Sequence, residues 1–326
     1  MRSSRGGGRR SASAGPDPLR VFLTGGSGFL GAETTRRLVE AGNECAVLLR
    51  GDIAATRLAP HAARLHLVSG DLFAPESYRE ALKRFAPEAI IHCGWRGVAG
   101  ADRNDLGQLD NIVATGRLAE AAAEAGARIL IGVGSQAEYG LLSGRVAEAS
   151  PTEPTTLYGV SKLAAGRALL TIAAERGLRG AWGRVFSLYG PGEARPWLVP
   201  SLIRAFAAGR SPDLTACEQI WEFTHVGDAA AALLALLDSE ASGVFNIGSG
   251  EPTPLRDAVL MLRDLVAPGI EPGFGRTPYR PDQIMHLEAD ISQIRRATGW
   301  RPAVPLARGF AETVDWLQSS GDAGIH

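Results

Sequence analysis

Short runs of β-forming residues alternate with longer helical stretches along the chain from Leu19 onward. Parallel strands need a long crossover between them, and a helix usually supplies it. The alternation therefore predicts an α/β fold with a doubly wound parallel sheet covered on both faces. The expected strands are Arg20–Thr24, Glu44–Leu49, Leu65–Ser69, Ala89–His92, Arg128–Gly132 and Ala181–Phe186. The expected helices are Phe29–Ala41, Pro75–Phe85, Asp105–Ala125 and Thr156–Arg176.

The rhythm breaks after Tyr189, where 12 of the 19 prolines occur. Prolines at this density divide the chain into shorter elements. We expect a sheet domain at 19–186, to which 220–250 returns, and a smaller C-terminal α/β lobe for the substrate from 187–219 and 251–318. Residues 1–18 and 319–326 are expected to be disordered tails, and a basic interaction arm is the alternative for the Arg- and Gly-rich first tail.

Composition excludes several classes of protein. A formal net charge of -1 gives no basic field for a nucleic acid partner. The three cysteines form no CxxC pattern, so we expect neither disulfides nor a metal site, and a cytoplasmic location. The longest apolar run, Ala229–Leu237, has nine residues, whereas a membrane span needs about 20. We therefore expect no membrane partner.

The segment TGGSGFLG at 24–31 lies between the first expected strand and the first expected helix. It contains Gly26-x-Gly28-x-x-Gly31, in which glycines allow a tight turn, close approach of a pyrophosphate and close helix packing. Free N–H groups at the helix N-terminus can then bind the phosphates. This context predicts a Rossmann-like dinucleotide-binding domain. The expected cofactor-binding residues of the turn are Gly25, Gly28, Phe29, Leu30 and Gly31.

The end of the second expected strand indicates which dinucleotide binds. An acid there holds the adenine ribose of NAD, whereas an arginine accommodates the 2′-phosphate of NADP. Arg50 follows the strand, so NADP(H) is favoured over NAD(H). The alternative is that Arg50 is a solvated surface residue and Asp52 binds the ribose. Asp71 and Leu72, after the third strand, are expected to meet the adenine ring, although Asp71 also fits a helix N-cap.

Tyr158 and Lys162 stand four residues apart on one face of an expected helix. A phenol that works as an acid/base near neutral pH needs its pKa lowered by about 3 units, and a nearby lysine cation together with an oxidised, positively charged nicotinamide can supply this. Such a pair is common on helix surfaces. Lys162 is, however, one of only two lysines among the 34 basic residues, which favours a chemical role. Ser135, after the fifth strand, is expected to hydrogen-bond the reacting oxygen.

Ordered motifs from about Leu19 to Leu317 make the sequence resemble the extended short-chain dehydrogenase/reductase family, the NAD(P)-dependent epimerases, dehydratases and reductases of nucleotide sugars. They are TGGSGFLG at 24–31, Asp71-Leu72, His92-Cys93-Gly94, Asn111, GSQAEYG at 134–140, YGVSK at 158–162, RVFSLYGPG at 184–192, FTHVGD at 223–228, FNIGSG at 245–250 and GWRP at 299–302. The resemblance implies that Tyr158 is the acid/base. It also implies that Lys162 lowers the tyrosine pKa and holds the nicotinamide ribose, and that Ser135 binds the sugar oxygen. Hydride then passes between nicotinamide C4 and a sugar carbon, most often C4.

The resemblance also implies where the nucleotide sugar binds. The expected substrate-binding residues are Gln136, Ser187, Leu198, Gln219, Trp221 and Arg280. Arg280 matches the family arginine that pairs with the nucleotide diphosphate, a contact that is often bidentate. Trp221-Glu222 stands where many members have Arg-Asp, and Ser187 where many have Asn. Trp221 either stacks on a base or sugar or packs within the lobe.

The two residues that follow Ser135 limit which reaction of the family is expected. Family 4,6-dehydratases carry an acidic residue or pair there, because elimination of water needs a second acid and base, and this chain has Gln136 and Ala137. A 4,6-dehydratase is therefore disfavoured, and so is a 3,5-epimerase/reductase, whose cysteine is replaced by Ala137. We expect a reductase of a 4-keto or 4-keto-6-deoxy nucleotide sugar, because of Arg50 and the EYG ending at 138–140. The alternative is a 4-epimerase with tightly bound NAD.

Two further expectations concern partners and class. Regulators of this fold that bind NAD(P) without catalysis typically lose the tyrosine or the lysine, and this chain keeps both, so that class is a remote alternative. The helices expected at 105–125 and 156–176 are rich in alanine. Equivalent helices of the family form a dimer interface, which implies a homodimer. Small residues also suit helices packed within one subunit.

Overall fold

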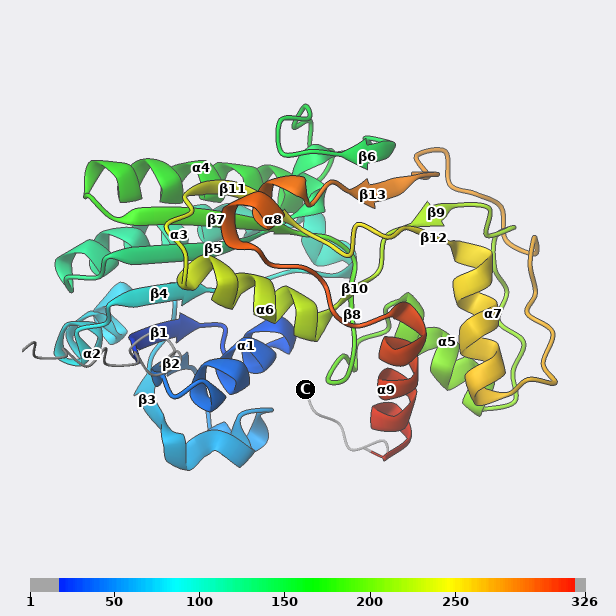
Figure 1. The fold of residues 1–326 in the computed structure, drawn as a ribbon, viewed down its shortest axis with the longest axis horizontal. Helices are drawn as coiled ribbons and strands as arrows, with labels where there is room; N and C mark the ends of the chain where they lie inside the picture. Colours follow the sequence, from blue (N-terminus) through cyan, green and yellow to red (C-terminus); the bar gives the residue numbers. More distant parts are fainter. Residues whose placement is uncertain (1–17, 320–326) are drawn as a thin grey trace, which may run out of the picture.

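The structure is a computed structural model that describes residues 18–319. Seven parallel strands form its central sheet in the order β11-β7-β5-β4-β1-β2-β3 (Figure 1). They are β1 (Arg20–Thr24), β2 (Glu44–Leu49), β3 (Leu65–Ser69), β4 (Ala89–His92), β5 (Ile129–Ser135), β7 (Arg179–Val185) and β11 (Gly243–Ile247). The strand order reverses between β1 and β4, so the predicted doubly wound α/β fold is confirmed. Apart from Pro18 and Ser319, the expected tails lie outside the described residues.

Inner strands of the sheet are buried on both faces, which explains their nearly continuous apolar sequences. All residues of β4 are buried, and in β1 only Arg20 is exposed. β5 runs to Ser135, beyond the expected end at Gly132. Glycine is a poor strand former, but a Cβ at Gly132 or Gly134 would collide with the Trp182 side chain on β7. The large indole therefore takes the space that these glycines leave.

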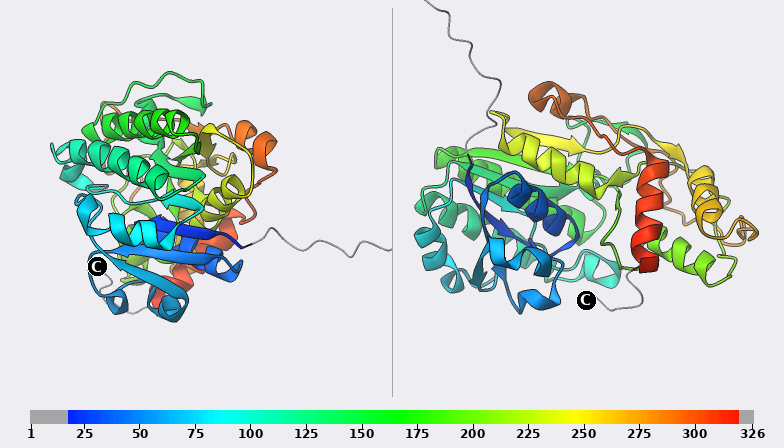
Figure 2. Two further views of the ribbon diagram at one scale, coloured as in Figure 1. Left: turned by 90° about the vertical axis from the view of Figure 1, so that its left-hand side faces the viewer. Right: turned by 60° about the horizontal axis from the view of Figure 1, so that its bottom comes forward.

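Helices cover both faces of the sheet, as the views in Figures 1 and 2 show. α1 (Phe29–Glu40) and α6 (Val226–Leu237) pack together on one face, while α2 (Arg79–Phe85), α3 (Gln108–Glu124) and α4 (Leu157–Glu175) cover the other. The helix expected at Pro75–Phe85 begins instead with the 3-10 turn η3 (Pro75–Ser77). The 3-10 turn and the helix α2 are separated by Tyr78, which has φ -128° and ψ -14°, outside the α-helical range.

A second lobe lies beside the sheet, at the right of Figure 1. α5 (Leu198–Ala207), α7 (Leu255–Val266) and α9 (Leu306–Ser319) surround a separate core that includes Phe206, Val259 and Phe310. Three short strand pairs join this lobe to the sheet. They are β8 (Leu188–Tyr189) with β10 (Thr224–His225), β9 (Ile220–Trp221) with β12 (Thr253–Pro254), and β6 (Gly144–Val146) with β13 (Leu287–Ala289). Among the helices of residues 18–319, none combines the length and the hydropathy needed to cross a membrane.

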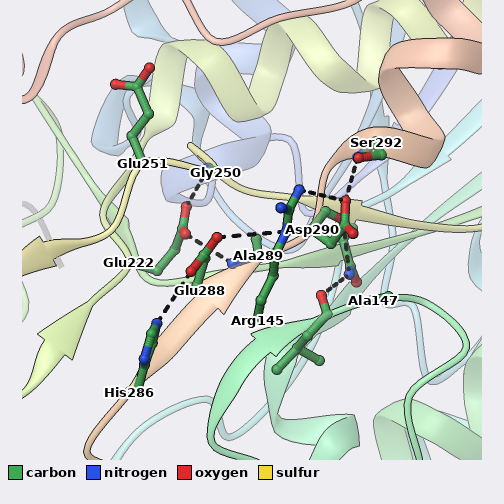
Figure 3. Close-up of polar contacts among 12 residues, drawn as sticks. Arg145, Ala147, Glu222, Gly250, Glu251, His286, Glu288, Ala289, Asp290 and Ser292 are labelled. Atoms are coloured by element: carbon green, nitrogen blue, oxygen red, sulfur yellow. Dashed lines mark hydrogen bonds and ion pairs between the residues drawn. The ribbon is translucent and has the colours of Figure 1, made fainter.

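Glu222 connects three segments at the junction between the lobe and the sheet (Figure 3). Its carboxylate is fully buried and accepts hydrogen bonds from the backbone N–H groups of Ser249, Gly250 and Ala289, the last at 3.0 Å. Beside it, β13 lies parallel to β6, and Arg145 forms an ion pair with Asp290 at 3.3 Å. Glu222 therefore fixes the chain immediately after Trp221 with three N–H donors.

Candidate active site

The glycine turn after β1 has the geometry of a phosphate cradle. Gly25 adopts φ +67°, and its carbonyl accepts a hydrogen bond from Gly28 N at 3.0 Å. A Cβ at Gly25 would lie 2.5 Å from Gly94 N, and one at Gly31 would collide with Gly25 O. No side chain caps α1 at Gly28, so the first N–H groups of the helix stay available to an acceptor. These features fit the pyrophosphate of a dinucleotide, which Phe29, Leu30 and the glycines would hold.

Residues expected at the adenosine end have different surroundings. Arg50 is exposed, and it forms no ion pair with the part of the chain that the structure describes. The Asp52 carboxylate accepts a hydrogen bond from Ala54 N at 2.9 Å and so caps the 3-10 turn η1 (Ile53–Ala55). Asp71 accepts from Phe73 N at 3.0 Å, and Leu72 is buried. The preference for NADP(H) stays a prediction.

Arg57 was not predicted from the sequence, yet it bridges the glycine turn and the chain after β8. Its Nε donates to Gly192 O at 2.9 Å, and its Nη1 donates to Ser27 O at 3.4 Å. Burial lowers the pKa of Arg57, while the nearby Glu193 acts in the opposite direction. Nothing in the local pattern around Arg57 marks it, because its partner Gly192 is distant in sequence.

Ser135, Tyr158 and Lys162 are brought together at the carboxyl end of β5. Ser135 ends this strand, and Tyr158 and Lys162 lie on the first turns of α4, which Thr156 caps through Gly159 N at 3.1 Å. Lys162 Nζ is 5.9 Å from the centre of the Tyr158 ring and donates to the Val133 carbonyl at 2.7 Å. The structure therefore brings the three predicted catalytic residues together.

The electrostatics of this group are those of a dry site. Burial raises the pKa of Tyr158, whereas the Ser135 hydroxyl and the charge of Arg103 oppose that increase. Burial also lowers the pKa of Lys162 to about 7. The lysine is 4% exposed, and its Nζ lies 3.7 Å from the centre of the Trp95 ring. Three aromatic rings, those of Trp95, Tyr158 and Trp182, lie within cation–π range of this ammonium.

Glu138 holds the loop that carries Ser135. It is 0% exposed, and one carboxylate oxygen accepts from Ser135 N and from Trp182 Nε1, both at 2.9 Å. The other oxygen pairs with Arg184 Nε at 2.8 Å. The sequence analysis used Glu138 only as part of a family pattern. Its buried partners show that it is an anchor of η5 (Gln136–Tyr139).

Gln136 and Ser187 meet each other, as two expected substrate-binding residues should if they line one site. Gln136 Oε1 accepts hydrogen bonds from Ser187 N at 3.0 Å and from Ser187 Oγ at 3.4 Å. Ala137 follows with a methyl group only. Neither position beside Ser135 therefore offers a side chain that exchanges protons.

The loop after β4 supplies two side chains that the sequence did not reveal. Trp95 meets the Tyr158 ring edge-on, with 6.1 Å between centroids, and the Arg103 guanidinium lies 4.2 Å from the centre of that ring. Asn111 holds this loop by accepting from Arg96 N at 3.0 Å. Because the loop has neither helical nor strand periodicity, no pattern in the sequence indicated which of its residues face Tyr158.

The remaining expected substrate residues are spread over the second lobe. Leu198 is the first residue of α5 and is exposed. Gln219 is 3% exposed, and its Oε1 has no hydrogen-bond partner within residues 18–319. Trp221 is half-buried on β9. The Arg280 side chain is 75% exposed and pairs with Asp282 at 3.8 Å.

Among residues 18–319, no group of three or more His, Cys, Asp and Glu side chains is arranged to hold a metal ion. His92 instead bridges strands and helix, with Nδ1 2.6 Å from Thr24 Oγ1 and Nε2 3.0 Å from Thr115 Oγ1. Burial lowers the pKa of His92 to about 3, with Lys162 adding to the effect, so the ring is neutral.

Comparisons with known proteins agree with this geometry. A model of the NAD dependent epimerase/dehydratase family matches residues 21–248. The chain is 25% identical to the dTDP-L-rhamnose 4-epimerase of Burkholderia thailandensis, with 94% of this chain and 97% of that protein covered. It is 28% identical to the dTDP-6-deoxy-L-talose 4-dehydrogenase (NAD(P)(+)) of Kitasatospora kifunensis, with 90% and 94% covered.

A solved structure gives the same picture. The chain superposes on MoeE5 in complex with UDP-glucuronic acid and NAD with a TM-score of 0.81 and 28% identity, covering 92% of this chain and 99% of that one. The relatives named here act on nucleotide sugars or bind them. Because the family model spans well over half of its length, the chain belongs to the NAD dependent epimerase/dehydratase family of nucleotide-sugar enzymes.

Proposed function

We propose that this enzyme transfers a hydride between a nicotinamide dinucleotide and C4 of a nucleotide hexose. One observation carries the proposal: the loop beside the reacting tyrosine has no second group free to move a proton. The Gln136 amide is bonded to Ser187, and Ala137 has only a methyl group. The Glu138 carboxylate is occupied by three donors. Chemistry at the carbonyl carbon is then possible, whereas elimination of water, which needs a further acid and base, is disfavoured.

The residues divide the work between proton transfer and orientation. The bound dinucleotide supplies or accepts the hydride. For reduction, Tyr158 donates its phenolic proton to the ketone oxygen, and Ser135 Oγ holds that oxygen by a hydrogen bond. In the opposite direction the Tyr158 phenolate takes the proton of the C4 hydroxyl. Lys162, four residues along the same helix, would stabilise the phenolate and bond the nicotinamide ribose.

Reduction of a 4-keto or 4-keto-6-deoxy nucleotide sugar with NADPH is the form of this reaction that we favour. The exposed guanidinium of Arg50, at the end of β2, supports it, since it has no carboxylate partner in residues 18–319. A 4-dehydrogenase that uses NAD(P)(+) is among the relatives. A second copy of this chain is the partner that we propose.

A 4-epimerase with retained NAD is the second candidate, and one specific observation favours it. Arg57 joins the glycine turn to Gly192 in the chain after β8. A bridge of this kind would make the turn less free to open and so would slow release of a dinucleotide held there. MoeE5, at 28% identity, holds NAD.

One experiment separates the candidates. Purified protein is incubated with dTDP-4-keto-6-deoxyglucose and either NADPH or NADH, and in parallel with UDP-glucose and no added cofactor. Loss of reduced-nicotinamide absorbance with the keto sugar identifies the reductase. A C4 epimer of UDP-glucose, seen by NMR without net change in cofactor, identifies the epimerase. A product that has lost water would refute the proposal.

A further inference from the structure

Arg103 is a cation beside Tyr158 that no acidic side chain of residues 18–319 neutralises. It lies on η4 (Gly100–Asn104), in the loop after β4, and its guanidinium carbon is 4.2 Å from the centre of the Tyr158 ring. Its Nη1 donates a hydrogen bond to the Val98 carbonyl at 3.3 Å. Within residues 18–319 it has no ion-pair partner, whereas Arg96 of the same loop pairs with Asp110 at 2.8 Å.

Lys162 is by contrast buried and already engaged by other groups. It is enclosed by the rings of Trp95 and Trp182, and its ammonium is bonded to a backbone carbonyl. Burial lowers the pKa of Lys162 to about 7. A guanidinium keeps its charge at any working pH. The permanent cation nearest the Tyr158 ring is therefore Arg103.

The other groups that face Tyr158 do not replace this charge. The Ser135 hydroxyl and Arg195 favour the phenolate, and Glu138 disfavours it. Arg195 is held by Glu193 through two hydrogen bonds, at 2.9 and 2.7 Å, and so acts largely as a neutral pair. Glu138 is likewise paired with Arg184. Arg103 alone among these ions lacks a counter-ion in the described chain.

We propose that Arg103 is a positioning residue that stabilises the Tyr158 phenolate by lying over its ring, and so sets the pH range in which the tyrosine transfers protons. The proposal rests on the proposed role of Tyr158 as acid/base. A cation beside a phenol favours the ionised form, so loss of Arg103 must raise the phenol pKa. The loop after β4 thereby contributes to catalysis through the charge of Arg103.

The first test needs no substrate. Tyrosinate absorbance of the full chain is followed against pH, and the difference between wild type and Tyr158→Phe isolates one of the five tyrosines. We expect Arg103→Met to raise that pKa by about one unit, which lowers the ionised fraction about tenfold at pH values below it. Arg103→Lys should restore part of the shift, because it returns a charge without the planar group. An unchanged pKa in Arg103→Met overturns the proposal.

A matched control is available in the same loop. Arg96 lies 4.0 Å above the Phe73 ring, as Arg103 lies above Tyr158, but it faces no catalytic residue. Arg96→Met should leave the phenol pKa unchanged, and an equal shift in both variants would mean that the loop rather than the charge is responsible. Arg103→Gln serves as a second neutral variant, and circular dichroism checks that each variant is folded.

Kinetics then separates this inference from the proposed function. With the substrate pair that the assay above identifies, the limb of kcat/KM that Tyr158 controls should move to higher pH in Arg103→Met. This is the alkaline limb for reduction, which needs the protonated phenol, and the acidic limb for oxidation of the C4 hydroxyl, which needs the phenolate. If Tyr158→Phe retains turnover, the proposed function fails. If Tyr158→Phe is inactive but Arg103→Met leaves both the phenol pKa and the rate profile unchanged, only the role of Arg103 is overturned.

Discussion

Replacing Glu138 by glutamine tests how much stability its buried carboxylate provides. The side chain is 0% exposed and is bonded to Ser135 N, Trp182 Nε1 and Arg184 Nε. A glutamine of the same shape can still accept from one side with its oxygen. Its NH2 group, however, then faces another donor, and the Arg184 charge stays buried without a counter-ion. Breaking a buried pair in this way costs about 3–5 kcal/mol.

A surface pair provides the matched control. Glu120 and Arg176 are also 2.8 Å apart, but their side chains are 36% and 53% exposed. Exposed pairs of this kind contribute about 0–1 kcal/mol, because water already solvates both charges. Glu120→Gln should therefore change the free energy of unfolding very little, although the chemical change is identical.

Urea unfolding followed by circular dichroism measures both variants. We expect the midpoint of Glu138→Gln to fall clearly below that of wild type and the midpoint of Glu120→Gln to stay near it. Because Glu138 also fixes Ser135 N, kcat/KM should fall in Glu138→Gln even where the protein remains folded. Equal midpoints for the two variants would falsify the argument that the Glu138 carboxylate stabilises the fold more than Glu120 does because it is buried.

Three further predictions follow from single residues. Arg50→Ala should raise the Kd for NADPH far more than the Kd for NADH in a fluorescence titration, and an equal loss for both would remove the basis for preferring NADP(H). The pKa of His92 is lowered by burial from 6.5 to about 3, so the unfolded chain binds a proton that the folded chain does not, and stability present above pH 6.5 is lost as pH falls toward 3. In acid-unfolding curves His92→Gln should show a shallower decline over that window, and an unchanged slope would contradict the assignment. Val113 is 54% exposed on α3, so Val113→Glu should convert a dimer to a monomer in light scattering; a wild-type monomer at micromolar concentration would refute the dimer.

Most of the sheet domain could be predicted from local sequence patterns. The strands at β1 to β4 have the expected bounds because each is a short apolar run between polar turns. The turn at Gly25–Gly31 and the pair Tyr158–Lys162 could also be predicted, since their chemistry depends on residues close together in sequence. The role of Glu138 could not, because its partners Trp182 and Arg184 lie on β7.

Trp182 shows why contacts between residues distant in sequence could not be predicted. Its indole occupies space left by Gly132 and Gly134 on β5 and by Gly166 on α4, where a Cβ would lie 2.6 Å from the ring. The same ring donates to Glu138 and lies within cation–π range of Lys162. The three glycines weaken a strand and a helix, but together they make the space that the indole fills. A smaller residue at 182 would leave a cavity under the active site, free the Glu138 oxygen and let water reach Lys162, so the stability of the sheet and the electrostatics of the lysine must change together.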